Sequence, residues 1–337
     1  MSYIFDVYNR KVEVQKNILD LALYIMLFPQ LIAGPIVRYI DVNREIRERH
    51  TDMDMVHDGI IRFMTGFCKK IFLANSMGYA ADMIFGRVYE LNTPYAWLGA
   101  VCYALQIYMD FSSYSDMAIG LGKMFGFHFL ENFQYPYISK SIREFWRRWH
   151  ISLSSWFRDY VYIPLGGSRR GVGKTYRNLL IVFLLTGLWH GADWTFLAWG
   201  MFHGIFLVLE RGAFGKILER FPGWLKRLYT LAVVLIGWVF FRCDTITEAF
   251  AYLKAMFAFD FGNYNIYQIL ECFDREFLLM MAVSLVGCLP LAPAWKARFR
   301  QNQAVGLVTD LGLFAVFACA VLYMVGADFN PFIYFRF

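Results

Sequence analysis

The chain has 337 residues, of which 58% are hydrophobic and only 18% are charged, whereas an ordinary soluble domain is about half apolar and about 25% charged. The mean hydropathy is +0.40. This composition excludes an ordinary soluble protein and predicts a multi-pass membrane protein that contacts membrane lipid. The net charge of +6 is explained by basic loops that meet anionic headgroups, so we expect no nucleic-acid partner.

Eight apolar stretches are candidate membrane spans. Several are short for a bilayer, which takes about 20 apolar residues per crossing, so we expect tilted, broken or re-entrant segments. No internal repeat, low-complexity segment or soluble linker is visible, and the sequence therefore predicts a single all-α membrane domain over residues 1–337. The stretches cover roughly residues 18–36, 60–86 (interrupted by Lys69-Lys70), 94–109, 178–190, 193–209, 228–241, 277–292 and 305–326.

The first and third stretches carry polar or helix-breaking residues. Pro29-Gln30 and Gly34-Pro35 interrupt the first, which is typical of a re-entrant or kinked helix. The third is followed by a run of polar residues that could line a cavity or tunnel wall, or could form a hydrated helix break; we favour the break. These residues are Asp110, Ser112, Ser113, Ser115 and Asp116.

Residues 139–158 form an amphipathic segment. Ser141 followed by Glu144 is a capping box, which predicts a helix that begins near Ile142. We expect one helix at the membrane interface with its aromatic side chains directed inward. At helical spacing one face collects Ile142, Phe145, Trp146, Trp149, Leu153, Trp156 and Phe157, and the other collects Arg143, Arg147, Arg148 and Arg158.

His150 lies at the edge of the aromatic face of this segment, one turn from Trp146. It could point into the protein and take part in chemistry. From the spacing alone, the simpler interpretation is that His150 completes the polar edge of an interfacial helix.

The most informative stretch is LWHGADW at residues 188–194. It places His190 between two apolar runs that are predicted membrane helices. An ionisable side chain is costly at that depth, so an intramembrane histidine is a functional candidate, and histidine can accept and return a proton near neutral pH. We therefore predict that His190 is a catalytic base. For His203, a second intramembrane histidine, we expect packing in the helix bundle with a ring nitrogen bonded to a neighbour.

The loop charges predict an orientation in the membrane. Basic clusters lie at residues 169–177, 211–227 and 296–300, whereas residues 242–276 contain six acids and three bases. Because basic loops remain in the cytoplasm, the turn that carries His190 should face the outer half of the membrane.

Other chemistries find little support. Residues 168–175 nearly match a P-loop, but Ser168 replaces the first glycine and no strand precedes it. The chain has no HExxH motif, no Cys/His cluster at zinc spacing and no GxSxG motif. Its six cysteines lack a CxxC pair and are expected to be small buried hydrophobes. We expect neither a metal nor a bound cofactor.

Five ordered motifs carry a resemblance to a known family. They are FPQLIAGPIVR at residues 28–38, EFWRRWH at 144–150, WFRDYVYIPLGG at 156–167, LWHGAD at 188–193 and NPFIYF at 330–335. With these motifs the chain resembles the membrane-bound O-acyltransferase (MBOAT) superfamily, and within it the bacterial AlgI/DltB-like branch.

The resemblance implies a helical membrane body pierced by a tunnel, with His190 at the family's essential histidine and His150 at its second signature position. It implies a thioester donor from the cytoplasm, expected to be acyl-CoA and most simply acetyl-CoA. The acyl group is expected to reach an extracytoplasmic polysaccharide or cell-wall glycan through a partner acyltransferase protein, at the bacterial plasma membrane. Residues expected near the substrate are Trp146, Trp149, Trp189, Asp193, Arg147 and Arg148.

Family members usually carry further helices before the position that matches Ser2-Tyr3, so we expect this chain to lack the first few membrane helices of the family. Two alternatives belong to other classes. A transporter of a polysaccharide precursor would use the histidines as a proton relay, and it predicts inverted halves that the sequence does not display. The other is a non-catalytic scaffold or inactive fragment. Donor-dependent acyl transfer separates the three.

Overall fold

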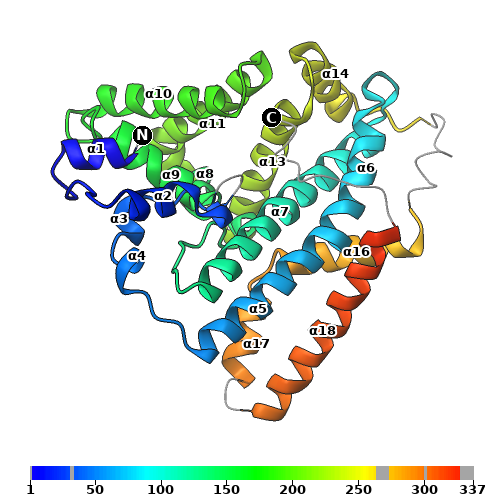
Figure 1. The fold of residues 1–337 in the computed structure, drawn as a ribbon. Helices are drawn as coiled ribbons and strands as arrows, with labels where there is room; N and C mark the ends of the chain where they lie inside the picture. The colour runs from blue at the N-terminus through cyan, green and yellow to red at the C-terminus, as the bar shows by residue number, and fades with distance from the viewer. Residues whose placement is uncertain (1, 31–33, 263–272, 300–301, 327–337) are drawn as a thin grey trace.

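The computed structural model describes residues 2–30, 34–262, 273–299 and 302–326, and these ranges contain helices and no strand. The predicted all-α class is therefore confirmed (Figure 1). Two helices, α13 (Gly223–Arg242) and α18 (Gln303–Gly326), are each long and apolar enough to cross a membrane. A third crossing is available if α16 (Arg275–Gly287) and α17 (Leu291–Phe299), which are bent by 67° relative to each other, act as one span.

The remaining elements are helices and single helical turns. The longer ones are α1 (Ser2–Tyr8), α2 (Ile18–Met26), α5 (Met53–Cys68), α6 (Asn75–Phe85), α7 (Thr93–Met124), α8 (Ile142–Arg148), α9 (Ile151–Phe157), α10 (Val172–His190), α11 (Trp194–Arg211), α12 (Ala213–Glu219) and α14 (Ile246–Phe257). The short turns are η1 (Phe28–Gln30), α3 (Tyr39–Val42), α4 (Glu45–Glu48), η3 (Val88–Glu90) and η4 (Pro136–Ile138), with π-helical turns at η2 (Lys69–Ala74) and η5 (Arg158–Tyr162).

The two predicted interruptions behave differently. Helix α2 ends at Met26, and Leu27 is extended before the Pro29-containing turn, which confirms a broken first stretch; residues 31–33 lie outside the described ranges. Lys69-Lys70 do not stop a helix, because α5, η2 and α6 follow one another directly and the π-helical turn absorbs the irregularity.

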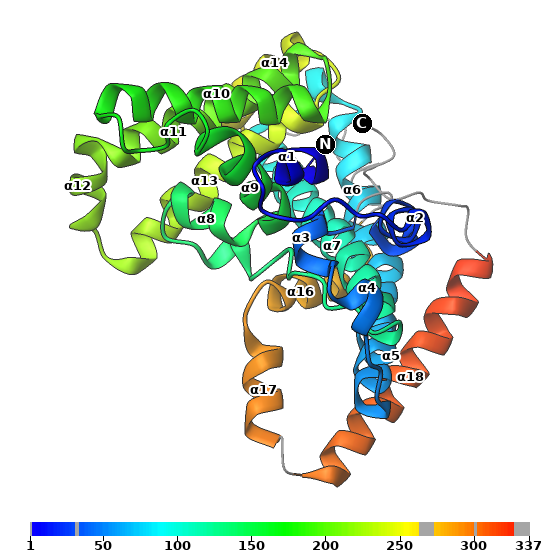
Figure 2. The same ribbon diagram turned by 60° about the vertical axis from the view of Figure 1, so that its left-hand side comes forward.

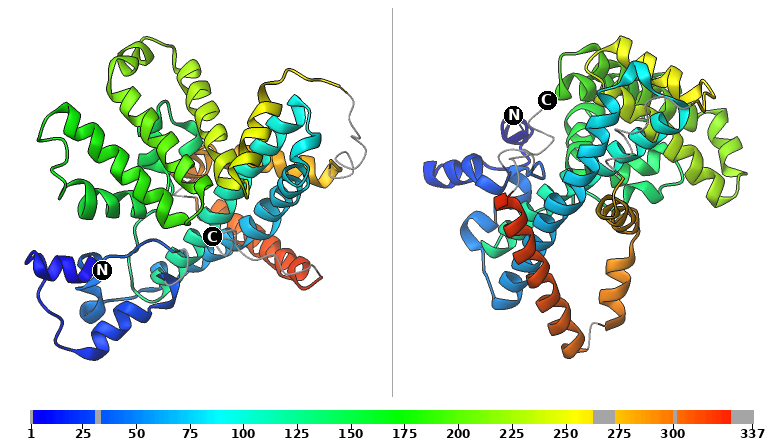
Figure 3. Two further views of the ribbon diagram at one scale, coloured as in Figure 1. Left: turned by 90° about the horizontal axis from the view of Figure 1, so that it is seen from above. Right: turned by 90° about the vertical axis from the view of Figure 1, so that its right-hand side faces the viewer.

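Helix α7 is the centre of the fold. It packs against α5, η2 and α6, and also against α13 and α14. Helix α18 lies along α5, and with α17 it extends away from the rest of the molecule (Figure 2). The antiparallel pair α10–α11 forms a second group, which α13 connects to the central helices (Figure 3). Helix α8 packs against α11 and α13. The residues of interest lie where these two groups meet.

Helix α7 continues through the polar run from Asp110 to Asp116, so the predicted helix break is wrong. Asp110 Oδ1 lies 2.7 Å from Lys70 Nζ, and their side chains are only 2% and 9% exposed. Asp116 contacts Lys69 Nζ at 2.8 Å and Arg62 Nη2 at 3.0 Å. Because cations from α5 and η2 neutralise both carboxylates, α7 continues as one helix through these polar residues, of which Ser112, Ser115 and Asp116 line a cavity.

Glycines allow the α10–α11 pair to approach closely. A Cβ atom on Gly200 of α11 would collide with the backbone carbonyl oxygen of Phe183 in α10, and one on Gly187 of α10 would collide with that of Phe196 in α11. Small residues at such crossings let two helix backbones touch. The contact fixes the end of α10, and with it His190, against α11.

Candidate active site

The amphipathic segment forms two helices, so the prediction of one continuous helix is wrong. Helix α8 begins at Ile142 as expected, because Ser141 Oγ accepts a hydrogen bond from the backbone N–H of Glu144 at 3.0 Å. It ends at Arg148. His150 then adopts a left-handed conformation, with φ of +44° and ψ of 55°, before α9 starts.

Pairing with a distant loop explains the break at His150. The backbone N–H of Ile151 donates to the carbonyl of Asn132 at 3.0 Å, and the N–H of Gln134 donates to the carbonyl of Arg148 at 2.9 Å. Two loop contacts thus replace the helical hydrogen bonds of this turn. A left-handed residue other than glycine is uncommon and costs free energy, so it persists only where the surroundings hold it.

His150 is buried, which corrects the interpretation that it completes a polar edge. It is 2% exposed, and its imidazole centroid lies 4.7 Å from the ring of Phe111 and 6.5 Å from that of Phe133. Nδ1 lies 3.2 Å from Oδ1 of Asn132. Nε2 is also buried, and it has no hydrogen-bond partner within the described ranges.

The hydrogen bonds around Asn132 determine the tautomer of His150. Asn132 Oδ1 accepts the backbone N–H of Ser152 at 3.2 Å and the Ser152 hydroxyl at 2.9 Å. A backbone N–H can only donate, so the amide oxygen and not its nitrogen must face this site. In the neutral ring Nδ1 therefore carries the proton, and Nε2 presents a lone pair.

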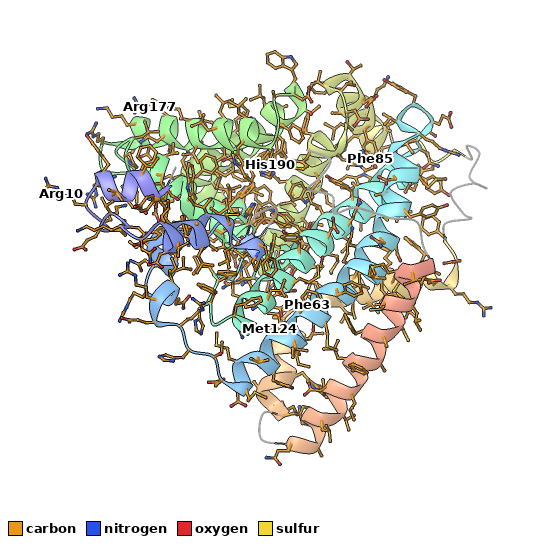
Figure 4. All side chains as sticks on the ribbon, in the orientation of Figure 1. Arg10, Phe63, Phe85, Met124, Arg177 and His190 are labelled. Carbon is orange, nitrogen blue, oxygen red and sulfur yellow. The ribbon has the colours of Figure 1, made fainter. Side chains whose placement is uncertain are left out.

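His190 is the last residue of α10 and lies among aromatic rings from three helices. Its centroid is 5.1 Å from Trp199 of α11 and 5.0 Å from Phe241 of α13, both edge-on, and 6.4 Å from Phe196 of α11. Nδ1 is buried without a hydrogen-bond partner among the residues that the structure describes. Figure 4 shows His190 among crowded side chains below the end of α10. Aromatic rings thus pack against the imidazole, while the residue as a whole remains partly exposed.

Trp189 joins the two signature histidines. Its indole centroid lies 4.9 Å from the ring of His190 and 6.2 Å from the ring of His150. The indole is 44% exposed, so it also forms part of the surface beside the site. Three residues predicted near the substrate are thus brought together, although 39 positions separate Trp189 from His150 in the sequence.

Trp146 and Trp149 belong to the packed core. Trp146 lies 5.6 Å from Trp199 and 5.2 Å from His203, and Trp149 lies 4.9 Å from Trp238. Both are less than one-tenth exposed, which confirms that the aromatic face points inward. Their contacts support the walls around the histidines.

Arg147 and Arg148, predicted together, lie in different pockets. Arg147 lines a pocket of about 250 Å³ together with three other arginines, Ser154 and Tyr162. Arg148 lines a separate chamber of about 650 Å³ beside α7. The lining arginines of the smaller pocket, which we call the arginine pocket, are Arg143, Arg147, Arg158 and Arg211.

The place of Asp193 near the substrate stays a prediction, whereas the hydrogen bond expected for His203 is not found among the described residues. Asp193 is exposed and precedes α11, but its side chain makes no capping hydrogen bond. His203 is fully buried in α11 as predicted, yet neither ring nitrogen has a hydrogen-bond partner within the described part of the chain. Its Nε2 instead faces Gly237 of α13, where an added Cβ would lie only 2.6 Å away.

Asn132 is the residue that sequence reasoning missed. It is fully buried and contacts both His150 and Ser152. It lies in a loop between α7 and α8, where a single asparagine carries no periodic or spacing signal. Its role becomes visible only when the loop is placed beside the break at His150.

Comparison with known proteins identifies the family. Residues 9–247 match the model of MBOAT, the membrane-bound O-acyltransferase family. The chain is 41% identical over 367 residues to the probable alginate O-acetylase AlgI of Azotobacter vinelandii, covering 100% of this chain and 73% of that protein. It is 40% identical over 247 residues to the peptidoglycan O-acetyltransferase of Helicobacter pylori, covering 71% and 47% of the two chains.

A more distant similarity is to the teichoic acid D-alanyltransferase of Streptococcus thermophilus, at 33% identity over 205 residues, which covers 56% of this chain and 48% of that protein. The region matched by the family model contains both His150 and His190. These matches confirm the resemblance drawn from the motifs. The chain is an O-acyltransferase of the membrane and belongs to the membrane-bound O-acyltransferase family.

Proposed function

We propose that His190 is the general base that moves an acyl group from a thioester to an acceptor hydroxyl. The observation that carries the proposal is the contact of Trp189 with both His190 and His150, which unites the two signature positions at one site. The acceptor hydroxyl gives its proton to His190 while its oxygen attacks the thioester carbonyl. The carbon–sulfur bond breaks, and the leaving thiolate takes the proton from His190. A positioned general base typically raises the reaction rate by about 10²–10⁴-fold.

His150 has a more specific role in this scheme. Because Asn132 holds the proton on Nδ1, Nε2 accepts a hydrogen bond. His150 therefore orients a hydrogen-bond donor other than the reacting hydroxyl, whose one proton goes to His190, and does not polarise the carbonyl. The aromatic rings that pack against His190 make its surroundings largely apolar, which disfavours wasteful hydrolysis of the thioester.

The proposed donor is an acyl-CoA, most simply acetyl-CoA, that enters from the cytoplasm. Its phosphates would bind the arginine pocket, which is lined by four arginines, of which Arg158 also pairs with Asp159. Val182 of α10 lines this pocket. It precedes His190 by eight residues in the same helix, a rise of about 12 Å. Helix α10 thus links a site for the charged end of the donor to the proposed base.

The proposed acceptor is a hydroxyl of an extracytoplasmic polysaccharide or cell-wall glycan, reached through a partner acyltransferase protein. The names of the relatives support this class, since they specify alginate, peptidoglycan and teichoic acid. The predicted orientation supports the direction, because it places the basic loops in the cytoplasm and the His190 turn toward the outside. We also propose that residues 1–337 act as one membrane domain.

The test measures O-acetyl content of surface polysaccharide and cell wall in cells that carry the wild type, His190→Ala or no gene. We expect acetylation only with the wild type, while both proteins reach equal abundance in the membrane. The matched control is His57→Ala, since His57 is exposed and bonds only Asp310 at 3.0 Å among the described residues. Wild-type acetylation by His190→Ala would exclude the role of His190. Equal acetylation in cells with the wild-type gene and in cells without it would favour the transporter or the scaffold.

A further inference from the structure

The ring of Phe133 lies between a cavity and His150. Phe133 lines the 650 Å³ chamber that Arg148 also lines. The same ring stacks on the imidazole of His150, with a centroid distance of 6.5 Å and an interplanar angle of 27°. One aromatic side chain therefore separates the chamber from one of the two signature histidines.

The backbone on both sides of Phe133 is held in place. The carbonyl of Asn132 accepts the backbone N–H of Ile151 at 3.0 Å, and the N–H of Gln134 donates to the carbonyl of Arg148 at 2.9 Å. Arg148 Nη1 in turn donates to the carbonyl of Gln134 at 3.1 Å. Phe133 is thus a fixed part of the wall, because its two chain neighbours are both bonded to the segment around His150.

Other aromatic rings fix the side chain of Phe133. Its ring lies 5.0 Å from Phe111 of α7 and 5.0 Å from Trp149, both edge-on, and 6.0 Å from Tyr108. Phe111 also contacts the imidazole of His150 edge-on at 4.7 Å. Phe111 and Phe133 together close the space beside His150, and of these two only Phe133 lines the chamber.

The opposite side of the site is formed by the packed core. The rings of Phe196, Trp199 and Phe241 lie against His190 from α11 and α13, and each of these residues is less than one-tenth exposed. They leave little room for a long acyl chain, which would have to extend toward His150 instead.

The chamber behind Phe133 can hold a hydrocarbon chain. The cations of its wall are paired, because Asp116 contacts both Arg62 and Lys69, and Arg148 contacts Glu144. The volume of about 650 Å³ is in the range of small-molecule sites. Apolar surface in the chamber comes from Leu73, Tyr108 and Met109.

We propose that Phe133 determines the acyl specificity of the enzyme by limiting the transferred group to a short one such as acetyl. The proposal deepens the proposed function and rests on it, because the thioester is taken to react beside His190 and His150. A longer chain that extends toward His150 overlaps with the ring of Phe133. Removing the ring joins this space to the chamber, which then accepts the chain.

The experiment uses inside-out membrane vesicles from cells that contain the full chain and its acceptor glycan. Radiolabelled acetyl-CoA or hexanoyl-CoA is added, and the rate of label transfer to polysaccharide and cell wall is measured at equal protein abundance. The variants are Phe133→Ala and Phe133→Leu. The matched control is Leu73→Ala, which enlarges the chamber at another wall and leaves the ring of Phe133 in place.

We expect the wild type and Leu73→Ala to transfer hexanoyl at least about tenfold more slowly than acetyl. Phe133→Ala should reduce this difference by about tenfold or more, since a few methylene groups that fit or clash change specificity on this scale, and Phe133→Leu should reduce it by less. Equal rates of the two donors with the wild type overturn the proposal. So does a ratio that neither Phe133 variant changes, or an equal change in Leu73→Ala. If Phe133→Ala fails to fold, Phe133→Leu decides.

His190→Ala in the same vesicles separates this proposal from the proposed function. It should lose transfer of both acyl groups, whereas the Phe133 variants should change the ratio of the two rates. Retained transfer by His190→Ala contradicts the role of His190, and an unchanged ratio contradicts the role of Phe133.

Discussion

Nδ1 of His150 lies 3.2 Å from Oδ1 of Asn132, and the same oxygen holds the backbone N–H and the hydroxyl of Ser152. One amide group thus fixes both the tautomer of His150 and the start of α9. The backbone N–H of Ile36 donates to the Ser152 hydroxyl at 3.0 Å, so the arrangement also connects the FPQLIAGPIVR motif to the histidine. The segments that contain Ile36, Asn132 and His150 thus meet at this site, through the Ser152 hydroxyl and the Asn132 oxygen.

Removing that oxygen should impair turnover more than substrate binding. We expect Asn132→Ala to lower kcat by about tenfold or more with a smaller change in KM, since one buried hydrogen bond that orients His150 is lost. Asn132→Asp keeps an acceptor oxygen and should retain more activity than Asn132→Ala. Acyl-transfer kinetics at equal membrane abundance provide the measurement. Equal activity of the two variants would contradict the orienting role.

The ion pair between Asp110 and Lys70 should be essential for stability. Asp110→Ala leaves the buried Lys70 ammonium without its carboxylate, and breaking such a pair costs about 3–5 kcal/mol. The control is Asp58→Ala, because Asp58 is exposed and lies 3.5 Å from Lys123, a pair expected to contribute no more than about 1 kcal/mol. Thermal unfolding in detergent measures both. Similar melting temperatures for the two variants would show that the buried pair is not needed.

Gly237 should not tolerate a methyl group. Its added Cβ would lie 2.6 Å from Nε2 of His203, whose ring is fully enclosed by aromatic side chains. We expect Gly237→Ala to destabilise the protein by about 1–3 kcal/mol, as overpacking does elsewhere. Gly312→Ala in α18 meets open space and should be neutral or stabilising, because alanine favours helix. If Gly237→Ala had the melting temperature of the wild type, α13 would be able to move away from His203 without loss of stability.

Asp159 should make stability depend on acid pH. Burial opposes its ionisation, but Arg158 and Arg38 outweigh burial and lower the pKa of Asp159 from its ordinary value of 3.8. A depressed pKa in the folded state contributes stability above the unfolded value, and this is lost as pH falls through the folded value. We expect the melting temperature of the wild type to fall below about pH 4.

In Asp159→Asn this part of the acid dependence should be absent, while stability at pH 7 should be lower by about 1 kcal/mol. Melting curves between pH 3 and pH 7 give the comparison. Parallel losses in the two proteins would assign the acid sensitivity to other carboxylates.

Local signals in the sequence predicted much of the fold. The start of α8 follows from Ser141 and Glu144, and the broken first stretch follows from Pro29, because these signals act within one helical turn. Two features could not be predicted in this way. Helix α7 passes through Asp110 because Lys70, 40 positions earlier, neutralises it. The helix after Ser141 breaks at His150 because the loop at Asn132 competes for its backbone.

The same distinction applies to the candidate site. His190 stood out because an ionisable residue between apolar runs is unusual, and the structure places it at the end of α10, before α11. Its role as a catalytic base stays a prediction. Arg147 and Arg148 are neighbours in sequence, yet the helix surface directs them to different cavities. Adjacent residues on a helix lie about 100° apart, so adjacency gave no information about a shared pocket.

The charges buried along α7 also bear on how the chain is inserted during synthesis. A segment that enters the bilayer with bare carboxylates is a poor substrate for the insertion machinery. The cations are synthesised before the carboxylates that they neutralise. The preceding segment carries Arg62, Lys69 and Lys70, and Asp110 and Asp116 follow. The carboxylates of α7 thus meet cations that were synthesised before them. Loss of a carboxylate on α7 or of its cation would therefore first cause failed biogenesis and degradation of the protein, before any effect on acyl transfer is seen.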